Sequence, residues 1–530
     1  MNHIDPIKAS MKIASEGKTL QAKKILMDAL AQNENKIAIL NALGDLTYLS
    51  EELNDAIHFY EKSLRIFSQQ PNILFNVAVI HKYSGNLVKA LEAYTRALEI
   101  RPNDLDCLNN RGNIFRELGL FEKAFQDLIK ANEILNSQPN MKSHKVEPWI
   151  IWLNLGNILM LLGRYDEAII FFDKGLSLKK LLPDLLKSKG VCLMYLARYQ
   201  DSIDCLIKAI DIRPHDLRMQ FDLALAYLSI GKYDEGFSMY ETRPFLKKLE
   251  RAIWTGAEDV SGKIIYVKAE QGLGDVIQFS RYIPMIEDLG AKIYFQVPKP
   301  LQKIIRSLGD KFEIVDEIEE GFDYYIHLMS LPYIFKTNLH NIPARERYLS
   351  VDKEKIALWK KKLNRSMRYQ VGLVWHGGFR ENRPDLWHIN HGYRNITCEF
   401  LERLFHLDID LVSLQKGDEA LDEMKNFLDK HPSFRIKEYS DEIEDFSDTA
   451  ALIENLDLVI SVDTSVAHLA ASLGKETWLL NRFNSCWRWN SSSKTRTPWY
   501  PSMKIFNQRK LGKWDDVMDD MIKNLKERTK

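Results

Sequence analysis

Small and bulky apolar residues recur at a fixed spacing through the first half of the chain. Six small residues share one register, 34 positions apart except for one longer step after Gly112: Gly44, Ala78, Gly112, Gly156, Gly190 and Ala224. In each copy a second small residue and then a bulky one follow, as Ala56 and Tyr60 follow Gly44. Small residues let two helices approach closely, and the bulky residue fills the space behind them. A period of this size predicts helix-turn-helix repeats stacked into an α-solenoid.

Turn and breaker residues mark the ends of the predicted helices. Four glycines separate the two helices of their repeats, namely Gly85, Gly119, Gly163 and Gly231. This pattern resembles the tetratricopeptide repeat family, with about seven repeats over residues 1–245. A polar stretch near 136–147, NSQPNMKSHKVE, interrupts the register and predicts a surface loop.

The pattern changes near residue 250, where short apolar runs begin to alternate with amphipathic stretches. KIIYVKAE, KIYFQV and YYIHLMS read as strands of a first succession over 250–365, and QVGLVWHGG, DLVSLQ and LDLVISV as strands of a second over 366–530. Strands that alternate with helices predict a parallel sheet. We therefore expect two doubly wound, Rossmann-like α/β domains, with a ligand in the cleft at the strand ends.

Composition narrows the classes of function. The chain has 73 basic and 73 acidic residues among 530, so its formal charge is zero, which argues against nucleic acid as the main partner. No run reaches the length of a membrane span, and the first ten residues lack a signal-peptide pattern. The five cysteines are scattered and form no C-x-x-C pair. These observations predict a reduced, cytoplasmic protein without an integral membrane segment.

The first loop with candidate chemistry follows strand KIIYVKAE and reads QGLGD. Gly272 and Gly274 permit a tight turn and close approach of a ligand, and Asp275 lies at the expected helix start. The loop lacks the third glycine and the downstream acid of a dinucleotide-binding motif. A carboxylate that only caps the helix is the alternative interpretation.

The second loop follows strand LDLVISV. Asp463, Thr464 and Ser465 precede helix VAHLAASLG, and short hydroxyl side chains with free N–H groups at a helix start favour an anion site. His468 lies one turn further on and would place a cation near a diphosphate. Helix capping together with a buried histidine is the alternative.

The third loop begins at Val374 and is rich in His, Arg and Gly. Its candidate ligand-binding residues are His376, Arg380, Arg383 and Arg394. A guanidinium can hold a phosphate or a carboxylate in a forked geometry. A merely solvated loop is the alternative. Asp408 and Asp410 form a D-x-D pair, but we interpret them as the edge of a strand and expect no metal site.

Asparagines recur within the predicted repeats. Asn76, Asn110 and Asn154 share one repeat position, and Asn113 and Asn157 share another. An amide both donates and accepts, so such a ladder predicts a groove that holds an extended peptide. Bridges between neighbouring repeats are the alternative role.

Several segments of the second half together resemble a known enzyme family. EQGLGDVIQFSRYIPMI, SLQKGDE, DFSDTAALIENLDLVISVDTSVAHLAASLGK and TPWYPSMKIF are similar to the two-domain GT-B glycosyltransferases related to bacterial lipopolysaccharide heptosyltransferases, and to bacterial fusions of that fold with tetratricopeptide repeats. The resemblance implies a GT-B fold with an acceptor-side domain at 250–365. It also implies a donor-side domain at 366–530 whose terminal helix crosses back to the first.

The resemblance also implies roles for individual residues. Asp275 would be the general base. The donor nucleotide-sugar would be bound by Gly272, Gly274, His376, Gln415, Lys416, Asp463, Thr464, Ser465 and His468. No metal or other cofactor is expected, because helix N-termini and basic side chains take the charge of the leaving diphosphate. Trp487 and Trp489 would stack on a base or sugar, with structural packing as the alternative.

The sequence therefore predicts an inverting glycosyltransferase that modifies Ser or Thr of a protein acceptor held by the repeats. Flagellin is an acceptor that the resemblance suggests. Three alternatives stay open: a binding scaffold with an inactive transferase-like half, a transferase for a lipopolysaccharide or lipid-linked acceptor, and an O-GlcNAc transferase, whose catalytic motifs are not found in the sequence.

Overall fold

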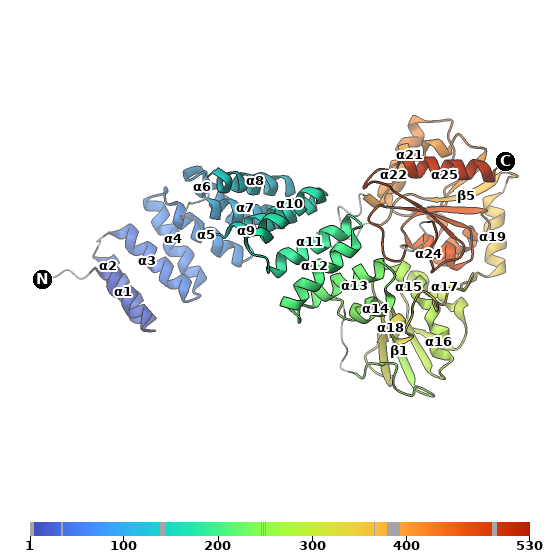
Figure 1. The fold of residues 1–530 in the computed structure, drawn as a ribbon, viewed down its shortest axis with the longest axis horizontal. Helices are drawn as coiled ribbons and strands as arrows, with labels where there is room; N and C mark the ends of the chain where they lie inside the picture. The colour runs from blue at the N-terminus through green and yellow to red at the C-terminus, as the bar shows by residue number, and fades with distance from the viewer. Residues whose placement is uncertain are drawn as a thin grey trace. The chain divides into compact units, whose positions relative to one another are not determined.

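The computed structural model describes residues 5–32, 35–137, 145–244, 246, 249, 251–364, 366–378, 393–489 and 495–529. The protein divides into two compact units, Met1–Lys180 and Leu181–Lys530. The first unit consists of helices, and the second of helices followed by two parallel sheets (Figure 1). The predicted repeats therefore continue across the division into the second unit.

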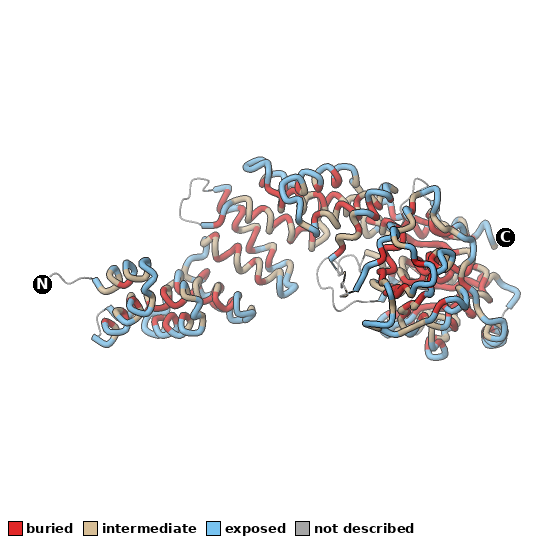
Figure 2. The backbone as a smooth tube through the Cα atoms, turned by 90° about the horizontal axis from the view of Figure 1, so that it is seen from below, coloured by how far each residue is buried: buried red, intermediate tan, exposed pale blue. Residues whose placement is uncertain are grey.

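The first unit contains helices that pack in consecutive pairs. They are α1 (Pro6–Ser15), α2 (Thr19–Ala31), α3 (Lys36–Leu49), α4 (Leu53–Ile66), α5 (Pro71–Tyr83), α6 (Leu87–Ile100), α7 (Leu105–Glu117), α8 (Phe121–Ser137), α9 (Pro148–Leu161) and α10 (Tyr165–Leu178). Most of these helices bury one side and expose the other, whereas α9 has no exposed residue (Figure 2). The second unit begins with two further pairs, α11 (Pro183–Tyr195) with α12 (Tyr199–Ile212) and α13 (Leu217–Ser229) with α14 (Tyr233–Tyr240).

The predicted contact between small and bulky residues closes the helix pairs. A Cβ atom at Gly112 would lie 3.0 Å from Cγ of Leu128, and one at Gly190 would lie 2.8 Å from Cγ of Leu206. A Cβ at Gly156 would overlap the ring of Phe172 in the same way. The glycines between the paired helices have φ angles of +72° to +79°, the left-handed region that favours glycine. The expectation of tetratricopeptide-like helix pairs is thus confirmed.

The first parallel sheet has four strands in the order β3-β2-β1-β4. Its strands are β1 (Ile264–Lys268), β2 (Lys292–Gln296), β3 (Phe312–Val315) and β4 (Tyr324–His327). The α-helices that follow its strands are α15 (Leu273–Phe279), α16 (Ile283–Glu287), α17 (Gln302–Ile305) and α18 (Leu331–Ile334). The strand order reverses between β1 and β4, and such switch points bind ligands in open α/β sheets.

The second parallel sheet has five strands in the order β6-β5-β7-β8-β9. Its strands are β5 (Tyr369–Val374), β6 (Ile409–Ser413), β7 (Leu458–Val462), β8 (Thr477–Asn481) and β9 (Met503–Asn507). Its helices are α19 (Lys353–Leu363), α21 (Cys398–Leu401), α22 (Asp418–Lys430), α23 (Phe446–Glu454), α24 (Ser465–Ser472) and α25 (Asp515–Arg528). Strand β7 is buried along its whole length, as a strand covered on both faces requires. The switch point lies between β5 and β7.

The closing helix differs from the prediction. The buried residues of α25 belong to a core formed with β5, β6, β7 and β8, so α25 covers the five-stranded sheet and does not cross back to the four-stranded one. Its apolar stripe explains this position, because Val517, Met521 and Leu525 belong to the same buried cluster as Trp478 of β8 and Phe506 of β9. Helix α19 precedes the second sheet in the chain and packs on α23. The indole N–H of Trp359 in α19 donates to Asp448 of α23 over 3.1 Å.

The loop near 136–147 is described only at its two ends, since residues 138–144 lie outside the described residues. At its far end, the backbone N–H groups of Lys145 and Val146 donate to the carboxylate of Asp106 in α7. Among the helices of the described ranges, none combines the length and the apolar character that a membrane crossing requires.

The packing of Gly156 against Phe172 leads to a first prediction. Gly156→Leu should destabilise the protein by about 1–3 kcal/mol or more, because the new side chain overlaps the ring of Phe172. The double variant Gly156→Leu with Phe172→Ala restores space and should recover part of the loss. Chemical denaturation followed by circular dichroism measures both. Equal stability of Gly156→Leu and wild type would contradict this account of the helix pair.

Candidate functional site

The loop after β1 places Asp275 on the first turn of α15. One carboxylate oxygen, Oδ2, accepts from the N–H of Gly272 over 2.8 Å, so Asp275 does cap its own helix. The other oxygen, Oδ1, lies 2.5 Å from a guanidinium nitrogen of Arg488. Burial disfavours the charge of Arg488, but the neighbouring groups, with the carboxylate of Asp275 first among them, together raise the pKa of the guanidinium. Two partners thus fix the carboxylate, and each oxygen keeps a lone pair for a further contact.

Helices α15 and α24 meet at their N-terminal ends, although they follow strands of different sheets. A Cβ at Gly274 would lie 2.7 Å from Cδ2 of His468 and 3.4 Å from Cα of Ser465. Glycine is therefore required at position 274 because the two helices touch there. We call this the α15–α24 contact. It brings together the first and second candidate loops, and a ligand cleft at this place stays a prediction.

The start of α24 is partly open to solvent. Asp463, Thr464 and Ser465 are all half-buried, and Thr464 occupies the position before the helix with its hydroxyl 3.0 Å from that of Ser461. Burial opposes the charge of Asp463, but the neighbouring groups, with Arg482 and Arg394 first among them, together hold the pKa of that carboxyl below its usual value. The start of α24 therefore carries the carboxylate of Asp463, which the charges of Arg482 and Arg394 stabilise.

His468 is buried and neutral. Its Nδ1 lies 2.9 Å from the hydroxyl of Tyr500, and its ring packs on Trp489 with centroids 4.7 Å apart. Burial lowers the pKa of His468 to about 4, although Asp463 and Asp275 act in the opposite direction. The imidazole has exchanged water for aromatic neighbours, which disfavours its charged form. A cationic role of His468 beside a diphosphate stays a prediction.

The third loop is described in part. Arg380 and Arg383 lie outside the described residues. Arg394 lies directly over Gly377, where a Cβ would overlap its guanidinium, and its charge acts on Asp463. Of the third-loop candidates, Arg394 is therefore placed near the α15–α24 contact.

Gln415 and Lys416 make internal contacts. The amide oxygen of Gln415 accepts from the N–H groups of Trp375 and His376, and its amide nitrogen donates to the carbonyls of His376 and Lys416. The ammonium of Lys416 donates to the carbonyls of Ser440 and Ile443 over 2.6 and 2.7 Å. These contacts hold the ends of β5 and β6 in place, and a direct role of either residue in donor binding stays a prediction.

The two candidate stacking residues are enclosed by protein. Trp487 is 4% exposed and Trp489 is 2% exposed. The ring of Trp487 packs against Phe237, Tyr240 and Phe279. This is the packing that the alternative interpretation describes, and stacking on a ligand stays a prediction.

The asparagines of the repeats are half-buried. The amide of Asn154 donates to Asn109 of the preceding repeat over 2.8 Å, and that of Asn76 lies 3.3 Å from the hydroxyl of Tyr60, also in the preceding repeat. The amide of Asn110 donates to a carbonyl of its own helix. Asn113 and Asn157 lie at the equivalent later position. Peptide binding by this ladder stays a prediction beside these bridges.

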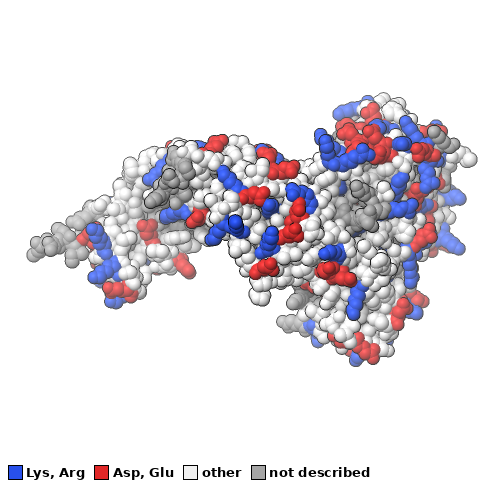
Figure 3. Space-filling model, viewed as in Figure 1, with Lys and Arg blue, Asp and Glu red and all other residues white. Residues whose placement is uncertain are grey.

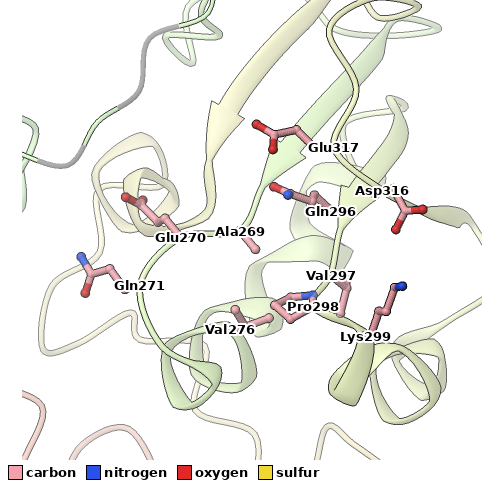
Figure 4. A pocket seen from close by; sticks show the side chains of 10 residues that line it. All are labelled: Ala269, Glu270, Gln271, Val276, Gln296, Val297, Pro298, Lys299, Asp316 and Glu317. Atoms are coloured by element: carbon pink, nitrogen blue, oxygen red, sulfur yellow. The ribbon is translucent and has the colours of Figure 1, made fainter. Parts of the chain in front are cut away.

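A pocket of about 330 Å³ opens at the carboxyl ends of β1, β2 and β3. Figure 4 shows its lining, with Gln271 on the loop that leads to Asp275 and Glu317 and Lys299 on other sides. The remaining lining residues are Ala269, Glu270, Val276, Gln296, Val297, Pro298 and Asp316. The pocket mixes acids, amides and one lysine beside an apolar floor. On the face of the protein in Figure 3, acidic and basic side chains are likewise interspersed.

Sequence reasoning missed three residues of this region. Arg488 stands between two buried tryptophans, and a charge flanked by buried aromatic residues is itself a signal of an ion pair. Arg281 is 4% exposed and donates to the carbonyl of Trp499 over 2.7 Å, which ties the turn after α15 to the segment between β8 and β9. Arg243, at the end of the repeats, pairs with Glu270 in the first loop.

Comparisons with known proteins support the repeats and a similarity across most of the chain. The tetratricopeptide repeat family matches residues 71–104 and 149–180. Protein FlbA from Caulobacter vibrioides is 27% identical over 79% of this chain and 72% of its own length. Protein O-mannosyl-transferase TMTC1 from Mus musculus is 27% identical over 29% of this chain and 15% of its own.

Other similarities are partial. BBSome complex member BBS4 from Bos taurus is 24% identical over 42% of this chain and 40% of its own length. The chain thus spans less than half of TMTC1 and of BBS4. A crystal structure of a tetratricopeptide repeat protein from Parabacteroides merdae has 20% identity and a TM-score of 0.36, covering 46% of this chain and 93% of that one.

The neutral state of His468 predicts a pH dependence. The folded pKa of His468 is about 4 and the ordinary value is 6.5, so the unfolded chain binds more protons between these values and stability falls as pH falls through that window. The loss should approach about 3 kcal/mol at the acid end. His468→Gln should flatten the slope of unfolding free energy against pH, whereas the same change at the exposed His406 should not. Parallel slopes for wild type and His468→Gln would rule this out.

Proposed function

We propose that this protein is a glycosyltransferase of the GT-B type that moves a sugar from a nucleotide-sugar to a protein. One observation carries the proposal: the loops after β1 and β7, from the two parallel sheets, meet at the α15–α24 contact. β7 borders the switch point of its own sheet, between β5 and β7, which is where open α/β sheets bind ligands. The resemblance of both loops to the heptosyltransferase motifs supports the same assignment.

The proposed reaction uses residues of this contact and requires no metal. The carboxylate of Asp275 takes the proton of the acceptor hydroxyl while the acceptor oxygen forms a bond to the anomeric carbon. The bond from that carbon to the diphosphate breaks, and its electron pair leaves with the diphosphate oxygen. The free N–H groups at the start of α24, with Arg394, would stabilise this charge. Attack from the side opposite the leaving group inverts the anomeric centre.

The acceptor side is proposed to be the pocket at the ends of β1, β2 and β3. It shares Gln271 with the catalytic loop, and its polar lining suits a hydroxyl-bearing group. The repeats would recruit the acceptor protein, since stacked helix pairs present an extended binding surface. The name of TMTC1, a protein O-mannosyl-transferase, fits a protein acceptor, and flagellin is an acceptor to test.

Replacing the proposed base gives a direct test. Asp275→Asn should still bind the donor but turn over about 10²–10⁴-fold more slowly, because the amide cannot take the acceptor proton. Release of nucleoside diphosphate from a panel of nucleotide-sugars, with and without flagellin, measures this. Asp445→Asn is the control, because Asp445 is also a paired carboxylate that caps a helix, at α23. Equal turnover of Asp275→Asn and wild type would remove Asp275 from the mechanism.

Donor binding has its own test. Thr464→Ala combined with Ser465→Ala should weaken nucleotide-sugar binding about tenfold or more, since each hydroxyl offers a charge-assisted hydrogen bond to phosphate. Isothermal titration calorimetry gives the affinity, and Ser472→Ala at the other end of α24 is the control. Unaltered affinity would refute the anion site. Failure of wild type to bind any nucleotide-sugar would favour a binding scaffold.

A further inference from the structure

Arg243 lies just after the last repeat helix, α14, and reaches into the four-stranded sheet. Its side chain is fully buried and holds the carboxylate of Glu270 with two bonds, of 3.0 and 2.6 Å. The same guanidinium donates to the hydroxyl of Ser330 over 2.9 Å, and Glu270 accepts from the N–H of Met329 over 3.2 Å. Glu270 follows β1, and Met329 and Ser330 follow β4. Arg243 therefore sits at the switch point of this sheet.

A second contact from α14 holds the next residue of the catalytic loop. The side-chain amide of Gln271 donates to the hydroxyl of Tyr240 over 2.8 Å. Gln271 has a φ angle of +64°, a left-handed conformation that is unusual for a residue other than glycine. Such a conformation persists only where neighbours fix it. Here Glu270 and Gln271, the two residues before the Gly272–Asp275 turn, are both held by the repeats.

The other partner of Asp275 is also supported by α14. The guanidinium of Arg488 lies 4.4 Å from the ring centre of Trp487, and that ring is enclosed by Tyr233, Phe237 and Tyr240 of α14. In addition, the indole N–H of Trp499 donates to the hydroxyl of Tyr233 over 3.2 Å. The aromatic rings of α14 thus position Arg488, and Arg488 positions the carboxylate of Asp275.

We propose that the last tetratricopeptide repeat is part of the transferase site, with Tyr240 and Arg243 as positioning residues for Asp275. Two routes lead to that carboxylate from α14 and the residues just after it, one through Glu270 and Gln271 and one through Trp487 and Arg488, and Tyr240 contributes to both. This inference deepens the proposed function and rests on it for the role of Asp275. The positioning itself is a property of the loop and is measurable without any substrate.

The alternative is ordinary packing between neighbouring parts of the second unit. Packing alone requires apolar surface, and the rings of α14 supply it. It does not require a buried two-bond ion pair at the switch point or a hydroxyl directed at a strained residue. A buried arginine between Glu270 and Glu241 is costly to place, and its geometry selects one arrangement of the loop. The polar contacts are what the proposal explains.

Two conservative variants of the full chain test the proposal. Tyr240→Phe removes only the hydroxyl that accepts from Gln271. Arg243→Lys keeps the charge but cannot form both bonds to Glu270. We expect backbone amides in residues 269–277 to exchange with deuterium about tenfold faster in each variant, the factor that corresponds to one lost hydrogen bond. Transfer should slow through kcat, with little change in the KM for the donor.

Arg213→Lys is the matched control. Arg213 forms an equivalent two-bond pair with Asp184 among the neighbouring repeat helices, but that pair is exposed. It should leave exchange in 269–277 and turnover unchanged. Unchanged exchange in Tyr240→Phe would overturn the proposal, even if Arg243→Lys failed to fold. If the variants exchange faster in residues 269–277 but the wild type transfers no sugar, the positioning of the loop is supported and the proposed function is rejected.

Discussion

The contact between the N-terminal ends of α15 and α24 is the constraint on which the site depends. Gly274 allows it, because any side chain there would overlap the ring of His468. It places a carboxylate from one parallel sheet next to a helix start from the other. The ion pair of Asp275 with Arg488 then fixes the carboxylate against the segment after β8. The two loops follow strands of separate sheets, and only the contact between α15 and α24 brings their residues close enough to act on one ligand.

The last repeat also contacts this arrangement, through residues of α14 and through Arg243 just after it. Arg243 occupies a switch point that a ligand fills in many open α/β sheets, so the repeats take the place of a ligand at that edge. The open pocket lies on the other side of β1, at the ends of β2 and β3. If the proposed function holds, the last repeat would present an acceptor at a fixed position relative to the loop that carries Asp275. This reasoning concerns the second unit, which begins at Leu181.

Local patterns in the sequence predicted the elements well, because their causes are local. The pairing of Gly112 with Leu128 is a consequence of helix geometry within one repeat, and the burial of β7 follows from its continuous apolar run. The closing helix α25 was predicted as an element but placed wrongly. Its apolar stripe is compatible with either sheet, and its place in the core of the five-stranded sheet is a tertiary property that the stripe alone does not specify.

The sequence predicted the motifs of the site but not which residues form ion pairs and hydrogen bonds with them. Asp275 and Ser465 were found because their loops have recognisable residues, whereas Arg488 and Arg243 are distant in sequence and belong to no motif. The charge state of His468 depends on Tyr500 and Trp489, which enclose the ring only in the folded chain. Burial and partners across the fold are tertiary properties, and residue spacing carries little information about them.

The most direct test of the central claim is a structure of the full chain bound to a non-hydrolysable nucleotide-sugar. The account predicts diphosphate oxygens within about 3 Å of the backbone N–H groups at the start of α24 and an anomeric carbon that faces the carboxylate of Asp275. A nucleotide bound away from both loops, or a sugar directed away from Asp275, would contradict it.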